Sequence, residues 1–348
     1  MVLAYVVNRI DTVSVIDTKT HSVSSTISVG DQLNNIAITP NGKLAYVLKG
    51  DIDFMGTVSV IDIKTHSVIA TIPINNNGNA QNSIVFTPDG KLAYVTNLGS
   101  GNVSVIDTKT HSVIATVAVE IGARSIVISP DGKLAYVAFS GGEGGVSVID
   151  TKTHNVIATV PVGDFPTLLA IVPGEKLVYV SNSSSGNMSV IDTNTHSVVA
   201  TVTVGVGPGE IVFTPNGKTA YLINGNQNGV GFVSVIDVKT HSVIATIPVG
   251  NVNDRPNDIA ITPEGKLVYV TTIFGDTVTV IDTKTQSTIA TVQVGDTPRG
   301  VTFTPDGKLA YVVNNGDATV SVIDVKTHSV IGTVTVGTNP VAIAFTEN

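Results

Sequence analysis

Histidine gives this sequence its widest range of possible chemistry, because a neutral imidazole can ligate a metal ion or act as a general base. Each histidine follows the same phrase, typified by VIDTKT, and the seven copies are His21, His66, His111, His154, His196, His241 and His328. Gln286 holds the eighth such position, and the Asp of the phrase recurs in the same way. A side chain that recurs once per repeat is spread around a molecule instead of converging on one metal or substrate. We therefore expect these histidines and aspartates to build turns.

Seven other charged residues are candidates for a binding site, because they lie in segments that differ between repeats. They are Asp51, Asp53, Arg124, Asp254, Arg255, Asp296 and Arg299. Asp51 and Asp53 form a D-x-D pair that could ligate calcium, but the glycine and distal Glu of an EF-hand loop are missing, so we expect no metal there. Arg124 and Arg299 are 175 residues apart in equivalent segments. They could clamp an anion, or pair with Glu120 and Asp296.

Familiar catalytic motifs are missing from the sequence. It contains no G-x-S-x-G elbow, no phosphate-binding loop and no H-E-x-x-H pair. The absence of Cys excludes disulfides, thiolate ligands and cysteine nucleophiles. We therefore expect no catalytic residues, no cofactor and no enzymatic activity.

Two phrases recur eight times along the 348 residues. VSVID and its variants place Asp at 17, 62, 107, 150, 192, 237, 282 and 324, and KLAYV and its variants place Tyr at 5, 46, 94, 136, 179, 221, 269 and 311. The period is roughly 42 to 48 residues, which is typical of propeller blades. Within one period we expect four strands, A to D, at residues 125–129, 134–138, 146–150 and 156–162. The sequence thus predicts an all-β, eight-bladed β-propeller of four-stranded antiparallel blades.

The phase of the repeat at the two ends predicts how the ring closes. The chain begins with a strand B at residues 3–7 and finishes with a strand A at residues 342–346. Pairing of this last strand with the N-terminal strands B, C and D completes the eighth blade and leaves no wide unpaired edge. Repeat spacings of 175, 175, 175 and 174 residues indicate a four-blade internal duplication, with halves at about 1–174 and 175–348. We expect residues 1–348 to form a single propeller domain.

Tyr94-Val95-Thr96-Asn97, the PDGK turn and the VIDTKT phrase together resemble the YVTN β-propeller family, which includes propeller domains of archaeal surface-layer proteins. The resemblance covers essentially the whole chain. It implies a propeller fold. For activity it implies little, since relatives include cell-surface proteins and a bacterial protein that binds single-stranded DNA.

The two faces of the expected ring differ. The A–B and C–D turns are nearly constant, whereas the B–C and D–A connections vary, as at residues 223–232. Acids outnumber bases on the variable face, where we place Asp11, Asp31, Asp51, Asp53, Glu120, Glu143, Asp164, Glu210, Asp254, Asp258, Asp276, Asp296 and Asp317. Variable loops on a rigid scaffold commonly bind partners. An acidic face repels nucleic acid.

The function that these features favour is a non-catalytic binding or scaffold module at the cell surface or in a surface layer. One alternative is single-stranded nucleic-acid binding by an A–B turn ring of Lys43, Lys91, Lys133, Lys176, Lys218, Lys266 and Lys308, whose neighbouring acids cancel much of its field. A second alternative is an enzyme with a cofactor or metal at the axial channel. We expect a monomer with a protein or cell-surface partner, no nucleic acid and no membrane span. We expect an extracellular location, while a cytoplasmic one stays open.

Overall fold

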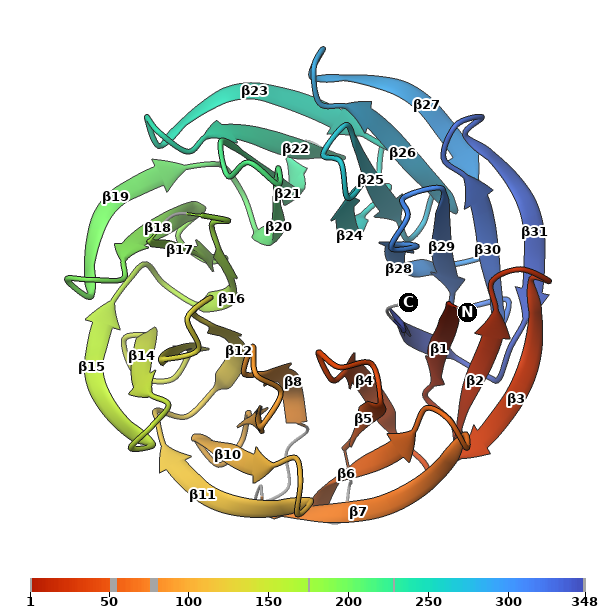
Figure 1. The fold of residues 1–348 in the computed structure, drawn as a ribbon. Helices are drawn as coiled ribbons and strands as arrows, with labels where there is room; N and C mark the ends of the chain where they lie inside the picture. Colours follow the sequence, from red (N-terminus) through yellow and green to blue (C-terminus); the bar gives the residue numbers. More distant parts are fainter. Residues whose placement is uncertain (1, 51–54, 76–80, 175, 228, 347–348) are drawn as a thin grey trace.

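Eight four-stranded antiparallel sheets surround a central axis in the computed structural model, which describes residues 2–50, 55–75, 81–174, 176–227 and 229–346 (Figure 1). All of the elements in these residues are strands. β-branched residues dominate them, and such residues fit a pleated, half-buried surface. The expected eight-bladed, all-β propeller is confirmed. No helix among the described residues has the length and apolar character of a membrane span.

Two strands of every blade lie nearest the axis. The inner strands, one per blade, are β4 (Leu33–Ile38), β8 (Gln81–Phe86), β12 (Ala123–Ile128), β16 (Pro166–Ile171), β20 (Pro208–Phe213), β24 (Pro256–Ile261), β28 (Pro298–Phe303) and β32 (Pro340–Phe345). The second strands are β1 (Leu3–Asn8), β5 (Leu44–Lys49), β9 (Leu92–Asn97), β13 (Leu134–Phe139), β17 (Leu177–Asn182), β21 (Thr219–Gln227), β25 (Leu267–Thr272) and β29 (Leu309–Asn314).

The other two strands of each blade lie farther out. The third strands are β2 (Thr12–Asp17), β6 (Met55–Asp62), β10 (Asn102–Asp107), β14 (Gly145–Asp150), β18 (Asn187–Asp192), β22 (Val230–Asp237), β26 (Thr277–Asp282) and β30 (Thr319–Asp324). The outer strands are β3 (Ser22–Ser28), β7 (Ser67–Asn75), β11 (Ser112–Ala118), β15 (Asn155–Pro161), β19 (Ser197–Thr203), β23 (Ser242–Val249), β27 (Ser287–Gln293) and β31 (Ser329–Thr335).

The constant turns are built by short polar side chains. Between β8 and β9, the Thr87 hydroxyl donates to Asp89 Oδ1 at 2.7 Å, and the Lys91 amide donates to the same oxygen at 3.1 Å. Between β10 and β11, Asp107 Oδ1 accepts the amides of Lys109 and Thr110. These bonds replace the strand ladder where the chain reverses. The repeated Asp therefore forms hairpins, as expected.

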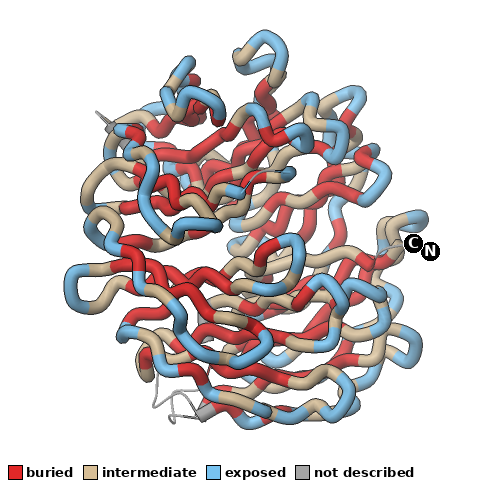
Figure 2. Tube along the Cα trace, turned by 60° about the vertical axis from the view of Figure 1, so that its left-hand side comes forward, coloured by how far each residue is buried: buried red, intermediate tan, exposed pale blue. Residues whose placement is uncertain are grey.

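The core lies between neighbouring blades. The eight repeated tyrosines are fully buried, and each contributes to a cluster of apolar side chains from two adjacent blades, as Tyr136 does with Leu169 and Val178 of the following blade. Tyr46 also meets Phe86 edge-to-face, with ring centroids 5.1 Å apart. Buried segments run through the strands, and exposed segments lie mainly in the turns (Figure 2). Each blade is therefore stabilised largely by its two neighbours.

The ring closes through the chain termini, as the repeat phase predicts. β32 pairs antiparallel with β1 in the sheet order β3-β2-β1-β32, with Tyr5 opposite Ala344. The Thr346 hydroxyl accepts the Leu3 amide at 2.9 Å, and the Thr346 amide donates to the Leu3 carbonyl at 2.9 Å. The N- and C-terminal ends lie side by side (Figure 1).

One expected loop is largely strand. Residues 223–232 extend the β21–β22 hairpin, which still pairs at Gln227 and Val230. Ile223, Phe232 and Val249 are buried there, so apolar packing carries the ladder outward beyond the usual blade length. The variable face is therefore partly made of extended hairpins.

Candidate functional site

The histidines are turn residues, and they also connect blades. All seven have φ between 50° and 55°, and Gln286 has φ 52°. The Nδ1 atom of each histidine lies within 3.4 Å of a tyrosine hydroxyl of the preceding blade, as in the 2.8 Å contact between Tyr179 and His241. They are therefore held apart around the ring. Among the described residues, no group of three His, Asp or Glu side chains is arranged to hold a metal ion.

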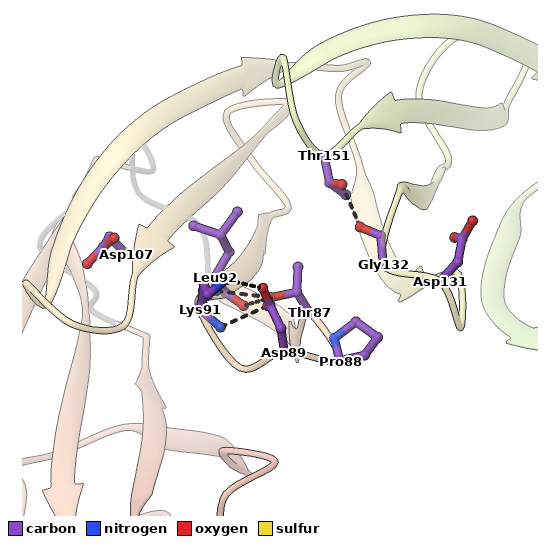
Figure 3. A pocket seen from close by; sticks show the side chains of 9 residues that line it. All are labelled: Thr87, Pro88, Asp89, Lys91, Leu92, Asp107, Asp131, Gly132 and Thr151. Atoms are coloured by element: carbon purple, nitrogen blue, oxygen red, sulfur yellow. Dashed lines mark hydrogen bonds and ion pairs between the residues drawn. The ribbon is translucent and has the colours of Figure 1, made fainter.

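A cavity of about 450 Å³ between blades is a feature of the repeat. It lies on the constant-turn face between Thr87 and Thr151, and Figure 3 shows Asp89, Lys91 and Thr87 joined within one turn while Asp107 stands apart. Cavities with the same turn positions occur at the interfaces that contain Asp131 and Asp306. Because the carboxylates are used in turns and the cavity recurs, we do not assign a site there.

A different cavity lies on the axis. Its volume is about 310 Å³, and it is lined by Asn35, Ser83, Arg124, Ser125, Ile126, Leu168, Leu169, Glu210 and Ile211. These residues come from inner strands β4, β8, β12, β16 and β20. Five of them are the third residue of their strand, which we call the axial position. A chamber of this size with few convergent polar groups has the general character of a small-molecule site.

Every inner strand is irregular next to its axial position. In β20 the pairing with β21 passes from Pro208 directly to Ile211, and in β24 the pairing with β25 passes from Pro256 to Ile259. Glu210 and Asp258 therefore lie inside bulges. A bulge changes the direction of a side chain relative to regular alternation, and it is common beside active sites.

Glu210 and Asp258 form a hydrogen-bonded carboxyl pair from adjacent blades. Burial, the charge of Asp258 and a hydrogen bond to it raise the pKa of Glu210 well above its usual value. Asp258 accepts the Val301 amide at 2.6 Å and the Ile259 amide at 2.9 Å. Burial raises the pKa of Asp258, while the hydrogen bonds from Glu210 and the two amides favour its ionised form. The pair thus retains a proton at a pH where isolated carboxyls are ionised, with Glu210 as the donor.

The internal duplication shows that the fold does not need these acids. The axial positions of the first half are Asn35, Ser83, Ser125 and Leu168, and those of the second half are Glu210, Asp258, Gly300 and Ala342. Asn35 and Ser83 thus stand where the second half has Glu210 and Asp258. Asn35 accepts the amide of its own blade as Asp258 does, at 2.8 Å from Ile36. The blades of the first half form with neutral polar residues at these two positions, so the two acids point to a function of the channel.

Arg124 lines the axial cavity from β12. Its Nε donates to the Ser140 hydroxyl at 3.1 Å, and its guanidinium carbon lies 4.7 Å from the centre of the Phe165 ring. Ser140 follows β13 and Phe165 precedes β16, so both lie in connections on the variable face. Arg124 is therefore held at the variable-face end of the channel. Among the predicted binding residues that the structure describes, it is the one that lines this cavity.

The other predicted binding residues that the structure describes lie elsewhere. Asp254 is buried and accepts the Asn251 amide at 2.6 Å, so it shapes its own loop. Asp296 accepts the Thr297 hydroxyl at 2.7 Å, while Arg255 and Arg299 are exposed. Arg299 uses its carbonyl oxygen to accept the Asn257 side-chain amide. Asp51 and Asp53 lie outside the described residues.

The lysine ring of the A–B turns carries neighbouring negative charge. Lys91, Lys133 and Lys308 form ion pairs of 3.1 to 3.3 Å with the Asp two residues before them. All three pairs are largely exposed and contribute little to stability. They reduce the positive field that single-stranded nucleic acid would need.

Two family models match parts of the chain. A model described as "Lactonase, 7-bladed beta-propeller" matches residues 195–343, and a model described as "Cytochrome D1 heme domain" matches residues 54–168 and 88–210. The lactonase segment contains both Glu210 and Asp258. Each match covers less than half of the chain, and the ring here has eight blades. No curated protein sequence was found to be similar.

Two similar solved structures carry the names of enzymes. Hydrazine synthase from Kuenenia stuttgartiensis is 25% identical, with a TM-score of 0.69 over 84% of this chain and 95% of that chain. The dihydro-heme d1 dehydrogenase NirN, solved in complex with DHE, is 17% identical, with a TM-score of 0.81 over 98% of this chain and 74% of that chain. The second likeness shows the fold alone. Together with the family models, these structures establish the chain as a β-propeller.

The comparisons overturn the expected function. The expected cell-surface scaffold is wrong, because the similar proteins are named for enzymes and for a haem domain. The expected absence of enzymatic activity is not tested by these likenesses. The scaffold expectation failed because it considered each residue type as a whole. A type that recurs in every blade was assigned to turns or to the core. Glu210 and Asp258 do not recur, and a comparison of the axial position across all eight repeats would have singled them out.

Proposed function

We propose that the axial cavity is an enzyme active site for a small molecule, and that Glu210 and Asp258 exchange a proton with the substrate. The observation that carries this proposal is the hydrogen-bonded carboxyl pair at a polar cavity on the axis. Such a pair keeps one carboxyl protonated, so that it can act as a general acid beside an ionised partner. The lactonase model, which spans both acids, supports a cyclic ester as the substrate class.

The reaction is the hydrolysis of a lactone to a hydroxy acid. The oxygen of a water molecule forms a bond to the ester carbonyl carbon, and the bond from that carbon to the ring oxygen breaks. The proton of Glu210 passes to the leaving alkoxide oxygen, and a proton of the attacking water returns to the carboxyl pair. Water is the only co-reactant, and the pair ends in its starting protonation state.

A haem group is the other ligand class that the comparisons raise, and the lining residues do not fit it. Protein ligands of haem iron are His, Cys, Met or Tyr. All seven histidines lie in blade turns, all eight tyrosines and Met188 are buried between blades, and the sequence has no Cys. The side chains that line the axial cavity are hydroxyls, amides, aliphatic groups, Arg124 and Glu210. We therefore derive no chemistry through haem.

The test is hydrolysis of γ-butyrolactone and δ-valerolactone, measured by the hydroxy acid that each releases. We expect the purified chain to hydrolyse at least one of them, and E210Q to lose about a hundredfold or more in kcat. Glu264 is exposed in an A–B turn, so E264Q is the matched control and should keep full activity. No hydrolysis of any lactone, or an E210Q rate equal to the wild-type rate, would overturn the proposal. A haemin titration is the parallel check, in which a stoichiometric shift of the haem absorption band would favour the haem class instead.

Other expectations stay predictions. These are the YVTN-type origin of the repeat, one domain for residues 1–348, a monomeric state, an extracellular location and no nucleic-acid binding. None of them is needed for the axial site.

A further inference from the structure

We infer that the substrate of the axial cavity carries an aliphatic chain, and that Ile121, Phe165 and Val206 bind this chain at the mouth of the cavity. We call these three residues the apolar rim. The inference rests on the proposed function, since it names the substrate class of the same site. Its basis is a set of exposed apolar side chains on three adjacent loops, each of which leads into a strand that lines the cavity.

The cavity lies in the part of the channel nearest the variable face. The inner strands begin at that face, because the D–A connections lead into them. The residues that line the cavity are the second, third and fourth residues of these strands, such as Ser125 and Leu168. The D–A loops therefore surround the mouth of the cavity.

The apolar rim is exposed on those loops. Ile121 is 64% exposed two residues before β12, Phe165 is 42% exposed immediately before β16, and Val206 is 56% exposed two residues before β20. β16 packs between β12 and β20, so the three loops are neighbours. Apolar side chains of these strands, including Ile126 and Leu168, line the cavity below the rim. Apolar surface therefore continues from the loops into the chamber.

The opposite half of the chain has polar residues at the same loop positions. The three counterparts, in the order of the rim residues, are Asp296, Asn339 and Asp31. The loops of this half form without apolar side chains, so the rim is not needed for folding. The apolar side chains lie on the side of the mouth that leads to Glu210, where a binding site for an apolar group requires them.

The backbone of Phe165 is a second, independent observation. Its φ is 55°, in the left-handed region that a bulky side chain rarely adopts. Its counterpart Asn339 has φ 52°, and asparagine tolerates this region. The Phe165 ring packs 4.7 Å from the guanidinium carbon of Arg124, which lines the cavity. The loop thus keeps a strained aromatic residue at the mouth, and such strain is common at binding sites.

The size of the rim suits a chain of a few carbon atoms. A stable protein interface uses about 20–30 residues on each side, whereas the rim has three side chains and polar counterparts across the mouth. A chain attached to a ring held beside Glu210 would leave the cavity along the strands that carry the rim. Its burial there would remove apolar surface of both the chain and the rim from water, which favours binding.

The experiment compares γ-butyrolactone with γ-octalactone, which adds a four-carbon chain to the same ring. We expect the wild type to have a kcat/KM about tenfold or more higher for γ-octalactone, because an apolar pocket gains about that for each methylene that it fully buries. The rim variant I121N/F165N/V206N should lose this preference and keep its kcat/KM for γ-butyrolactone. It should also keep the wild-type Tm, because polar residues hold these positions in the opposite half.

Two further variants separate the rim from exposed apolar surface in general. Ile69, Ile114 and Ile157 are each about half exposed at the third residue of an outer strand, where the first blade has Ser24. I69S/I114S/I157S should therefore keep the wild-type preference. I121V/V206I leaves the rim apolar and should keep it as well. Equal kcat/KM for the two lactones in the wild type, or an unchanged preference in the rim variant, would overturn the inference.

Binding separates this inference from the proposed function. If no lactone is hydrolysed, the enzymatic proposal fails, and binding of γ-octalactone measured by NMR still tests the rim. Binding that is kept in I69S/I114S/I157S and lost in the rim variant would support the inference. Absence of binding to the wild type, or equal binding to the rim variant, would overturn it. Self-association of the wild type that the rim variant abolishes, without lactone binding, would identify a contact between copies and would also overturn it.

Discussion

Glu210 and Asp258 show how identical strand positions can have different roles in a repeat protein. Asn35 and Ser83 occupy these positions in the other half, so the acids are not required to form the blade. Asp258 also has a structural part, since it accepts an amide of its own blade and one of the next. Glu210 has no comparable backbone partner among its described contacts, and its retained proton is a property of the pair.

Replacing Glu210 with Gln should therefore make the protein more stable than the wild type at high pH. The pKa of Glu210 is higher in the folded chain than the value of about 4.3 for an unfolded chain, so the folded state binds its proton more tightly. Stability from this group is complete below the unfolded pKa and is lost as pH rises toward the folded pKa. We expect E210Q, whose amide donates to Asp258 at every pH, to have a Tm about 1–3 °C above wild type at pH 8 and a smaller difference at pH 4.

Thermal unfolding of wild type, E210Q and E264Q across this pH range checks the sign. E264Q should follow the wild type. D258N should lose roughly 1–3 kcal/mol of stability. Asp258 accepts one backbone amide through each of its carboxylate oxygens, whereas an Asn side chain has a single oxygen that can accept. An E210Q curve that runs parallel to the wild-type curve would show that Glu210 ionises normally.

A polar contact connects the C–D turn of most blades to a tyrosine of the preceding blade. In seven blades a histidine lies against the tyrosine hydroxyl of its neighbour, whereas at the eighth interface Tyr221 donates to the Thr283 carbonyl and Gln286 holds the histidine position. Burial raises the pKa of Tyr221 to about 12, so its phenol remains a donor at neutral pH. This one interface departs from the consensus of the chain itself.

Restoring the consensus should stabilise that interface. We expect Q286H to add a Tyr221 contact without changing the left-handed turn backbone, and to raise the free energy of unfolding by about 0.5–1 kcal/mol. The reverse change, H241Q, removes the 2.8 Å contact with Tyr179 and should lower stability by a similar amount. Urea unfolding of both variants measures this. Equal effects of the same sign would indicate that the turn, and not the tyrosine contact, determines the energy.

Closure of the ring decides the stability of the whole molecule. Without β32, the first blade would keep three strands, and the edge of β1 would lose its antiparallel partner. Apolar contacts between β32 and the neighbouring blades would also be lost, including the edge-to-face contact of Phe345 with Tyr311 at 5.1 Å. An open ring exposes such an edge to aggregation.

Removal of residues 341–348 should therefore abolish the cooperative thermal transition or lower Tm by more than about 10 °C, because several core side chains are lost together. Removal of residues 347–348 alone is the control and should leave Tm unchanged. Differential scanning calorimetry and limited proteolysis measure the effect. A truncated chain with wild-type Tm and protease resistance would contradict closure by the termini.

The sequence by itself determined the repeated architecture. Eight copies of the Asp and Tyr phrases predicted eight blades, and the terminal phase predicted that residues 342–346 would pair beside Leu3. These inferences succeeded because turn chemistry and strand alternation are local properties. The recurring His and Asp were correctly assigned to turns for the same reason.

Only the tertiary structure decided which singular residues meet. Glu210 and Asp258 were placed on the acidic loop face, although they lie in β20 and β24 and are hydrogen-bonded to each other beside the axis. The bulges of the inner strands break the alternation from which side-chain direction is read, and the two acids are far apart in sequence. Their meeting depends on the packing of one blade against the next, which no local pattern records.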